Sequence, residues 1–291
     1  MSKSPKEPTL KREFAFSDQE FEQIRQLIYA RAGIHLTLSK KDMVYGRLAR
    51  RLRAINLDSF SDYIDVITSD GTQEREAFVN ALTTNVTSFF REEHHFKTLA
   101  AHVSTIKHRP IQIWCNAAST GQEPYSIAMT MMDLFDSLTP PVHIVATDID
   151  TAALQRAQAG VYTDEDIKKL PKAMLERYFL KGRANNTGSV KVRQELRDMV
   201  SFSQLNLLDD DWPVSGPFDA VFCRNVMIYF DKGTQCKILL KFIPTMQQDA
   251  LMFAGHSESF HNISQLFQLH EKTVYKIAKK AKPLAAYTPR K

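Results

Sequence analysis

The chain has 291 residues with 43% hydrophobic and 24% charged side chains, which is typical of a globular protein with one large domain and a smaller one. Its three cysteines, Cys115, Cys223 and Cys236, are too few and too widely spaced for a disulfide framework or a zinc motif, which predicts a reducing compartment, the cytoplasm. No apolar run is long enough to span a bilayer, and the polar N-terminus lacks the apolar core of a signal peptide.

The net charge of +5 is concentrated at one end of the chain. Residues 1–55 hold twelve Lys/Arg and six Asp/Glu, so this part carries +6 and the remainder carries −1. A local basic patch suits an acidic partner, which could be a nucleic acid, a membrane face or an acidic protein. A solvated helix face with spare lysines is the simpler alternative, and charge alone favours it.

The first third of the chain has the pattern of a small helical domain. Residues 1–11 are polar and are expected to be disordered, as are residues 280–291. Ser17 and Glu20 form the sequence pattern of a capping box, and Gly33 should end the helix that begins there. Apolar side chains recur in it at helical spacing, at Phe21, Ile24, Leu27 and Ile28. Further helices are predicted at 39–55, 59–68 and 73–82.

The predicted helix 39–55 has two distinct faces. Its apolar stripe contains Tyr45, Leu48, Leu52 and Ile55. A separate arc is basic and is expected to be exposed, with Lys40, Arg47, Arg50 and Arg51. Reversing Arg47 and Arg51 to Glu is therefore expected to leave the fold intact, because exposed charges contribute little to stability.

From about residue 110 the pattern alternates between strands and helices, which predicts a mainly parallel sheet covered on both faces. The expected strands are 111–115, 142–147, 220–223 and 251–254, and residues 267–270 and 274–277 could form a closing hairpin. Three helices are expected between them. One follows the loop 116–121 and ends near Phe135, and the other two span residues 151–159 and 232–243. Residues 160–200 break the alternation and look like an inserted piece with short strands of its own.

Three predicted strand ends carry groups that could bind a ligand, because open parallel sheets bind ligands at the carboxyl ends of their strands. The loop 117–121 has small residues that allow close approach, although a plain tight turn is as good an interpretation. Asp148 could accept the hydroxyls of a ribose, but it or Asp150 could equally be a helix N-cap. Arg224 and Asn225 leave a buried strand, where polar groups need partners, so a purely structural network is the alternative there.

Before the sheet, residues 82–91 form a segment rich in hydrogen-bonding side chains between the two predicted domains. Ligand sites favour such junctions, whereas the simpler interpretation is a polar linker with Phe89 and Phe90 packed inward. His94 and His95 have no matching set of metal ligands and are interpreted as surface or structural residues.

Together these segments resemble the CheR family of chemotaxis receptor methyltransferases. The resemblance rests on five strings in the same order, LTTNVTSFFREEHHF, WCNAASTGQEPYSIAM, ATDID, FDAVFCRNVMIYFDK and FAGHSES, and it covers nearly the whole chain. It implies an α/β fold, an S-adenosylmethionine-dependent methyltransferase (Rossmann-like) sheet with an inserted small β-subdomain and an all-helical N-terminal domain. The implied domains are 12–90 and 91–280, with the insertion at about 160–200.

The resemblance also implies a set of site residues. S-adenosylmethionine, with no metal, would be bound by residues matching the family's cofactor contacts: Asn85, Thr87, Arg91, Glu123, Asp148, Asn206, Leu207, Cys223, Arg224 and Asn225. Arg91 and Tyr229 would lie beside the transferred methyl group and serve catalysis. Gln122 departs from the family pattern, in which a second glutamate is usual, and Glu123 remains.

The implied activity is methyl transfer to glutamate side chains of membrane-bound chemotaxis receptors in a bacterial cytoplasm. An ionised glutamate needs no general base, so Arg91 is expected to orient it and not to activate it. The basic arc would dock on the acidic receptor helix. The family's β-subdomain turn is often linked to binding a receptor's C-terminal tail, but residues 181–189 contain Arg183-Ala184-Asn185, which leaves tail binding open. The enzyme is expected to be a monomer without direct membrane insertion.

Two other functional classes are weaker alternatives. The basic domain would suit the phosphates of a nucleic acid, but the chain lacks the aromatic and basic interleaving of a base-stacking groove. A cofactor-binding sensor without chemistry is disfavoured because Arg91 and Tyr229 are present.

Overall fold

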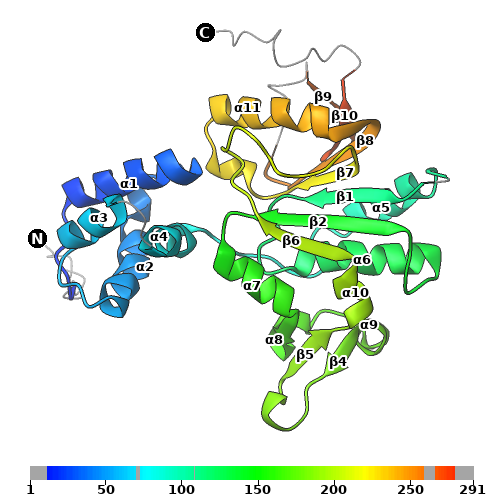
Figure 1. Cartoon of the computed structure of the whole chain (residues 1–291), viewed down its shortest axis with the longest axis horizontal. Coiled ribbons are helices and arrows are strands. Elements are labelled where there is room, and N and C mark those ends of the chain that lie inside the picture. Colours follow the sequence, from blue (N-terminus) through cyan, green and yellow to red (C-terminus); the bar gives the residue numbers. More distant parts are fainter. Residues whose placement is uncertain (1–11, 70–72, 108, 259–265, 279–291) are drawn as a thin grey trace, which may run out of the picture. The chain divides into compact units, whose positions relative to one another are not determined.

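The structure is a computed structural model that describes residues 12–69, 73–107, 109–258 and 266–278. The disorder expected at 1–11 and 280–291 lies outside these residues. The described part of the chain divides into two compact units, one within residues 12–31 and 35–82, and one within residues 32–34 and 83–278 (Figure 1). Among the described residues, no helix combines the length and the apolar character needed to cross a membrane.

The first unit is helical, as the sequence predicts. Its elements are α1 (Asp18–Ala32), a 3-10 turn (Leu38–Lys40), α2 (Lys41–Ala54), α3 (Phe60–Thr68) and α4 (Gln73–Leu82). The capping box is confirmed, because the Glu20 amide donates to Ser17 Oγ at 3.1 Å and the Ser17 amide donates to Glu20 Oε2 at 2.7 Å. Gly33 follows the end of α1 with a φ of +67°, a backbone conformation that favours glycine.

The apolar stripe predicted on α2 is correct at its centre. Leu48 and Leu52 are fully buried, whereas Tyr45 and Ile55 are half-buried at its margins. Val44 and Ala49 complete the buried face, which the prediction did not include. The core of this unit is strongly aromatic, and the rings of Phe16 and Phe60 lie 4.2 Å apart between centroids.

The second unit contains a seven-stranded sheet in the order β6-β2-β1-β7-β8-β10-β9. The parallel strands are β1 (Ile111–Cys115), β2 (Val142–Asp148), β6 (Val200–Gln204), β7 (Phe218–Cys223) and β8 (Met246–Ala254). The predicted closing hairpin is confirmed as β9 (Phe267–Glu271) and β10 (Val274–Ile277), which pair antiparallel. From β1 the chain adds β2 and then β6 on one side of β1, and it then adds β7 and β8 on the opposite side of β1. The order therefore reverses at β1, and the carboxyl ends of β1 and β7 form the switch point where such sheets bind ligands.

Helices cover both faces of this sheet because successive strand residues point to opposite faces (Figure 1). Ile111, Ile113 and Cys115 of β1 pack in one core with α5 (His94–Val103) and α6 (Gln122–Phe135), whereas Trp114 packs in a second core with α11 (Lys232–Phe242). Helix α7 (Thr151–Ala159) follows β2.

Strand β7 is fully buried although it contains a carboxylate. Asp219 is ion-paired to both terminal nitrogens of Arg109 and accepts the Gln112 amide at 2.9 Å. These partners satisfy a charge that would otherwise be costly to bury.

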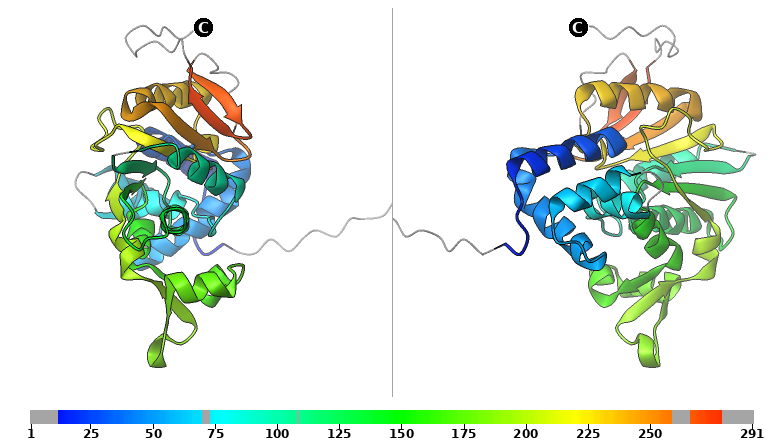
Figure 2. Two further views of the ribbon diagram at one scale, coloured as in Figure 1. Left: turned by 90° about the vertical axis from the view of Figure 1, so that its right-hand side faces the viewer. Right: turned by 60° about the vertical axis from the view of Figure 1, so that its left-hand side comes forward.

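The inserted piece is confirmed as a separate three-stranded antiparallel sheet in the order β3-β5-β4. Its strands are β3 (Val161–Thr163), β4 (Phe179–Lys181) and β5 (Ser189–Val192), accompanied by α8 (Asp164–Ile167), α9 (Lys172–Tyr178), a 3-10 turn (Ala184–Asn186) and α10 (Gln194–Asp198). In the views of Figure 2 it projects from one end of the second unit, away from α11 and the β9–β10 hairpin. Tyr162, Tyr178 and Phe179 are buried and attach it to the core beneath α6.

Candidate functional site

The loop after β1 lies along the end of β2. The Ala118 amide donates to the Thr147 carbonyl at 3.0 Å, and the Ser119 amide donates to Asp148 Oδ2 at 2.7 Å. Gly121, which precedes α6, has a φ of +96°, and a Cβ there would meet the Tyr162 hydroxyl at 2.7 Å and Ala157 Cβ at 2.9 Å. This loop is therefore a close-packed turn in which any side chain at position 121 would be strained, and it presents small residues at the carboxyl edge.

The structure separates the roles of the two aspartates after β2. Asp150 is the N-cap of α7, where its Oδ1 accepts the Ala153 amide at 2.9 Å. Its Oδ2 also accepts from Thr83 Oγ1 at 2.6 Å and from Asn85 Nδ2 at 2.7 Å. Asp148 is not a cap, which leaves it available for a ligand.

Asp148 is held with its carboxylate at the sheet edge. It is 9% exposed, and its oxygens accept the amides of Ser119 and Asp150. Burial raises the pKa of Asp148 to about 6, and the two amide donors oppose that rise. At neutral pH the group is therefore mainly ionised and has further lone pairs for hydroxyl donors.

Strand β6, which the sequence analysis did not predict, adds residues beside Asp148. Gln204 pairs with Asp148 in register, and the Leu205 amide donates to the Asp148 carbonyl at 3.0 Å. Asn206 and Leu207 follow directly, and Leu207 is buried. Asn206 Oδ1 accepts the Leu208 amide at 3.0 Å, which shapes the turn.

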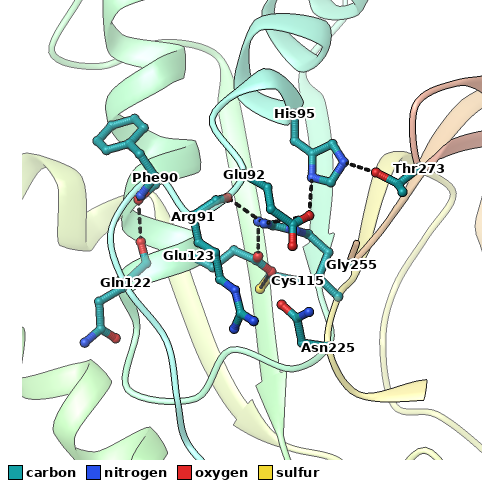
Figure 3. Close-up of polar contacts among 12 residues, drawn as sticks. Phe90, Arg91, Glu92, His95, Cys115, Gln122, Glu123, Asn225, Gly255 and Thr273 are labelled. Atoms are coloured by element: carbon teal, nitrogen blue, oxygen red, sulfur yellow. Dashed lines mark hydrogen bonds and ion pairs between the residues drawn. The ribbon is translucent and has the colours of Figure 1, made fainter. Parts of the chain in front are cut away.

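A buried network connects the ends of β1 and β7 with the segment before α5 (Figure 3). Arg224, whose side chain is 1% exposed, donates to Glu123 Oε2 at 2.5 Å and to the Arg91 carbonyl at 2.5 Å. Glu123 Oε1 accepts the thiol of Cys115 at 3.1 Å. The bond from Arg224 thus fixes the backbone of Arg91, while the Arg91 side chain points away from these contacts and donates to the Val86 carbonyl at 2.9 Å.

The turn after β7 is held by a carboxylate that sequence reasoning did not single out. Glu258, 5% exposed, accepts the amides of Gly255 at 2.6 Å, Asn225 at 2.8 Å and Met227 at 2.8 Å. Asn225 has a φ of +59°, so its backbone is in the left-handed region. Tyr229 follows in the 3-10 turn Met227–Tyr229. The FAGHSES string already contained this glutamate after small residues, which was its only sequence signal.

Other predicted site residues take no part in the hydrogen bonds described above. Thr87 and Tyr229 are half-buried, and Cys223 is fully buried at the end of β7. Burial raises the pKa of the Cys115 and Cys223 thiols, so neither is a nucleophile at neutral pH. His95 is a structural residue, as predicted, because it is buried, contacts Thr273 Oγ1 at 2.8 Å, and has its pKa lowered to about 2 by desolvation.

The expectation that the whole basic arc, which begins at Lys40 in the 3-10 turn and continues into α2, is exposed is wrong. Lys40 and Arg50 are exposed, and Arg47 is half-buried and donates to the Ala81 carbonyl. Arg51 donates through Nε and Nη2 to the two oxygens of the buried Glu74, at 2.9 and 2.6 Å. The arc thus divides into two exposed charges and two that stabilise the helical unit. Reversing Arg51 is therefore no longer expected to leave the fold intact.

Comparison with known proteins agrees with this arrangement. A family described as "CheR methyltransferase, SAM binding domain" matches residues 85–276, and "CheR methyltransferase, all-alpha domain" matches residues 19–83. The chain belongs to the CheR methyltransferase family. It is therefore an S-adenosylmethionine-dependent methyltransferase, with an α/β sheet, a small antiparallel sheet and an all-helical N-terminal part.

Curated relatives of the chain are named for chemotaxis. It is 50% identical to the chemotaxis protein methyltransferase of Salmonella typhimurium over 91% of this chain and 92% of the relative. It is 49% identical to that of Escherichia coli, over 91% of this chain and 93% of the relative. It is 48% identical to chemotaxis protein methyltransferase 2 of Pseudomonas aeruginosa, over 90% of this chain and 94% of the relative.

Proposed function

We propose that this chain transfers the methyl group of S-adenosylmethionine to glutamate side chains of membrane-bound chemotaxis receptors, and that the methyl esters serve sensory adaptation. The observation that carries the proposal is the fixed position of Arg91. Its carbonyl is bonded to buried Arg224, which also holds Glu123, while its guanidinium points away from that network. A planar cationic fork beside a proposed cofactor site suits a carboxylate acceptor.

The residues present fit the cofactor. Asn116, at the end of β1, is 2% exposed, and neither its amide nitrogen nor its amide oxygen has a partner of hydrogen-bonding geometry within the described structure. Glu123 can accept from an ammonium group, Asp148 can accept from ribose hydroxyls, and the turn at Ser119–Gly121 permits close approach. No group of three or more His, Cys, Asp or Glu suited to a metal occurs among the described residues.

We assign the cofactor's parts to the chain as follows. Asn85, Thr87, Arg91 and Glu123 hold the methionine part, and Asp148 holds the ribose. Asn206 and Leu207 lie by the adenine, and Cys223, Arg224 and Asn225 form the floor. The hydrogen bonds that join Asn85 to Ser119 and Asp150, and Ser119 to Asp148, support this assignment because they link the first two groups.

The chemistry requires positioning more than proton transfer. S-adenosylmethionine supplies an electrophilic methyl group on a sulfonium. A glutamate carboxylate with a pKa of about 4.3 is already ionised at neutral pH, so the chain needs no general base. Arg91 orients the carboxylate, and Tyr229 donates a hydrogen bond or shapes the approach. Orientation and desolvation can contribute roughly 7–11 kcal/mol to lowering the barrier.

Receptor recognition is proposed to use two surfaces. The basic arc docks along the acidic receptor helix, above all through the exposed Lys40 in the 3-10 turn and the exposed Arg50 in α2. The small sheet aligns Val161, Lys191 and Leu180 in one cross-strand row of exposed side chains. Two apolar side chains around a cation suit a receptor tail peptide with apolar and acidic residues. The enzyme would act as a cytoplasmic monomer.

Methyl transfer from tritium-labelled S-adenosylmethionine to receptor-bearing membranes tests the proposal. We expect membrane-bound label that is released as volatile methanol by base, because carboxylate methyl esters are base-labile. Membranes whose receptor carries alanine at the acceptor glutamates are the matched control and should remain unlabelled. Base-stable label, label on added RNA, or cofactor binding without any transfer would each contradict the proposal.

A further inference from the structure

Glu92, the residue after Arg91, is buried beside Arg224 although nothing in the proposed function uses it. Its side chain is 7% exposed, and its Oε2 lies 3.4 Å from Arg224 Nη2 and 3.6 Å from His95 Nδ1. Its Oε1 accepts the His256 amide at 3.2 Å. The backbone of Glu92 has a φ of +58°, so the chain adopts an unfavourable conformation in placing this side chain inward.

The charges in this cluster do not balance. Arg224 is one buried cation, and it pairs with two carboxylates, Glu92 and Glu123, whose side chains are only 7% and 12% exposed. His95 adds no charge at neutral pH, because desolvation holds its pKa far below 7. The cluster therefore carries one negative charge in excess, in a medium where charges interact strongly.

We propose that Glu92 is a positioning residue for the amino-acid part of the cofactor, acting through Arg224. Because Arg224 is shared between two carboxylates, it cannot fully neutralise Glu123. Glu123 thus retains negative charge toward an ammonium group at the sheet edge. This inference rests on the proposed function, in which Glu123 contacts that ammonium. Without Glu92, Arg224 would pair with Glu123 alone and the attraction would weaken.

Binding measurements on the full chain can isolate this effect. S-adenosylhomocysteine carries the ammonium group, whereas methylthioadenosine has the same nucleoside without the amino-acid part. Glu92→Gln, which keeps the shape and removes the charge, should weaken S-adenosylhomocysteine binding about tenfold and leave methylthioadenosine binding unchanged. Glu92→Asp keeps the charge and should preserve most of the preference for S-adenosylhomocysteine.

The adjacent Glu93 is a matched control. It is exposed and its carboxylate pairs with the exposed Lys97, so Glu93→Gln should change neither affinity. Glu92→Met is a second neutral variant of similar volume, and whichever neutral variant gives a native circular dichroism spectrum decides the question.

Two results would overturn the role of Glu92. One is an equal loss for both ligands in a folded neutral variant, which would mean general damage to the site. The other is unchanged S-adenosylhomocysteine binding. Failure of the proposed role of Glu123 is distinguishable, because the wild-type chain would then bind both ligands with similar affinity.

Discussion

Arg51 on α2 and Glu74 on α4 form a two-point ion pair inside the helical unit, and the Tyr63 hydroxyl donates to the same carboxylate at 2.9 Å. Glu74 is 8% exposed, so removing its cation leaves a buried charge poorly compensated. Arg51→Glu should lower the free energy of unfolding by about 3 kcal/mol or more. Urea denaturation measures the loss. Arg50→Glu, one residue earlier and exposed, should be nearly neutral, and equal effects of the two changes would contradict this account.

The exposed half of the basic arc should govern receptor docking. Lys40→Glu with Arg50→Glu should leave the fold and cofactor affinity intact and sharply lower the rate of receptor methylation, because like charges would face the acidic helix. Raising salt should slow the wild type by screening the same attraction. The rate of receptor methylation is measured against ionic strength for both proteins. Lys97→Glu with Lys107→Glu makes the same change of charge elsewhere on the surface and should be harmless. Identical rates and salt responses in the arc variant and the wild type would mean that this face is a solvated surface without a role in docking.

Local sequence signals predicted most elements because hydrophobic period and caps report on the face that each segment buries. Strand β1 and helix α7 were predicted with the bounds observed, and the Ser17–Glu20 box forms as predicted. Strand β6 escapes local reasoning because its apolar and polar alternation, Val200-Ser201-Phe202-Ser203, is only four residues long and directly follows the inserted piece.

The pairing of charges was beyond local reasoning. Arg224 and Glu123 are 101 residues apart, and helical periodicity alone placed Arg51 on an exposed arc. Asp148 and Asp150 were equivalent candidates for an N-cap until the folded chain showed which carboxylate faces the α7 amides. Tertiary contacts, which sequence spacing does not encode, decide such roles.

Glu258 should control the geometry of the turn that carries Asn225 and Tyr229. Its carboxylate accepts three backbone amides, and an amide side chain can offer only one oxygen to them. Glu258→Gln should lower the free energy of unfolding by about 1–3 kcal/mol. Turnover should also fall by more than the cofactor affinity does. Chemical denaturation and single-turnover kinetics measure these losses. Ser257→Ala, at the exposed neighbour, is the control, and a Glu258→Gln enzyme with normal turnover would refute the role of this carboxylate.

Arg91→Lys should separate chemistry from binding. Lys keeps the positive charge but lacks the planar fork that orients a carboxylate, so turnover should fall more than S-adenosylmethionine affinity. Calorimetry gives the affinity, and single-turnover methylation of receptor membranes gives the chemical step. Lys97→Arg, an exchange of the same kind on the exposed face of α5, should affect neither. Equal losses in binding and turnover would contradict the proposal that Arg91 mainly orients the carboxylate.

Asp148 should give cofactor binding a characteristic pH dependence. Burial raises its pKa to about 6, so the carboxylate is ionised at pH 8 and increasingly protonated as the pH falls through 6. Ribose hydroxyls donate best to the ionised form, so affinity for S-adenosylhomocysteine should be level above about pH 7 and should decline below pH 6. Asp148→Asn should weaken binding by about 1–3 kcal/mol at pH 8 and abolish this decline.

Stability should respond to the same group in the opposite direction. The folded-state pKa lies above the ordinary value of 3.8, so the folded chain holds this proton more tightly than the unfolded chain. The Asp148 contribution to stability therefore falls as the pH rises from about 4 to 6. The free energy of unfolding of Asp148→Asn, relative to that of the wild type, should therefore be higher at pH 8 than at pH 4. Calorimetric titrations and urea denaturation across this range measure both effects. Two results would contradict the assignment of Asp148 to the ribose. One is a wild-type affinity for S-adenosylhomocysteine that does not change with pH, and the other is an Asp148→Asn variant whose affinity still declines below pH 6.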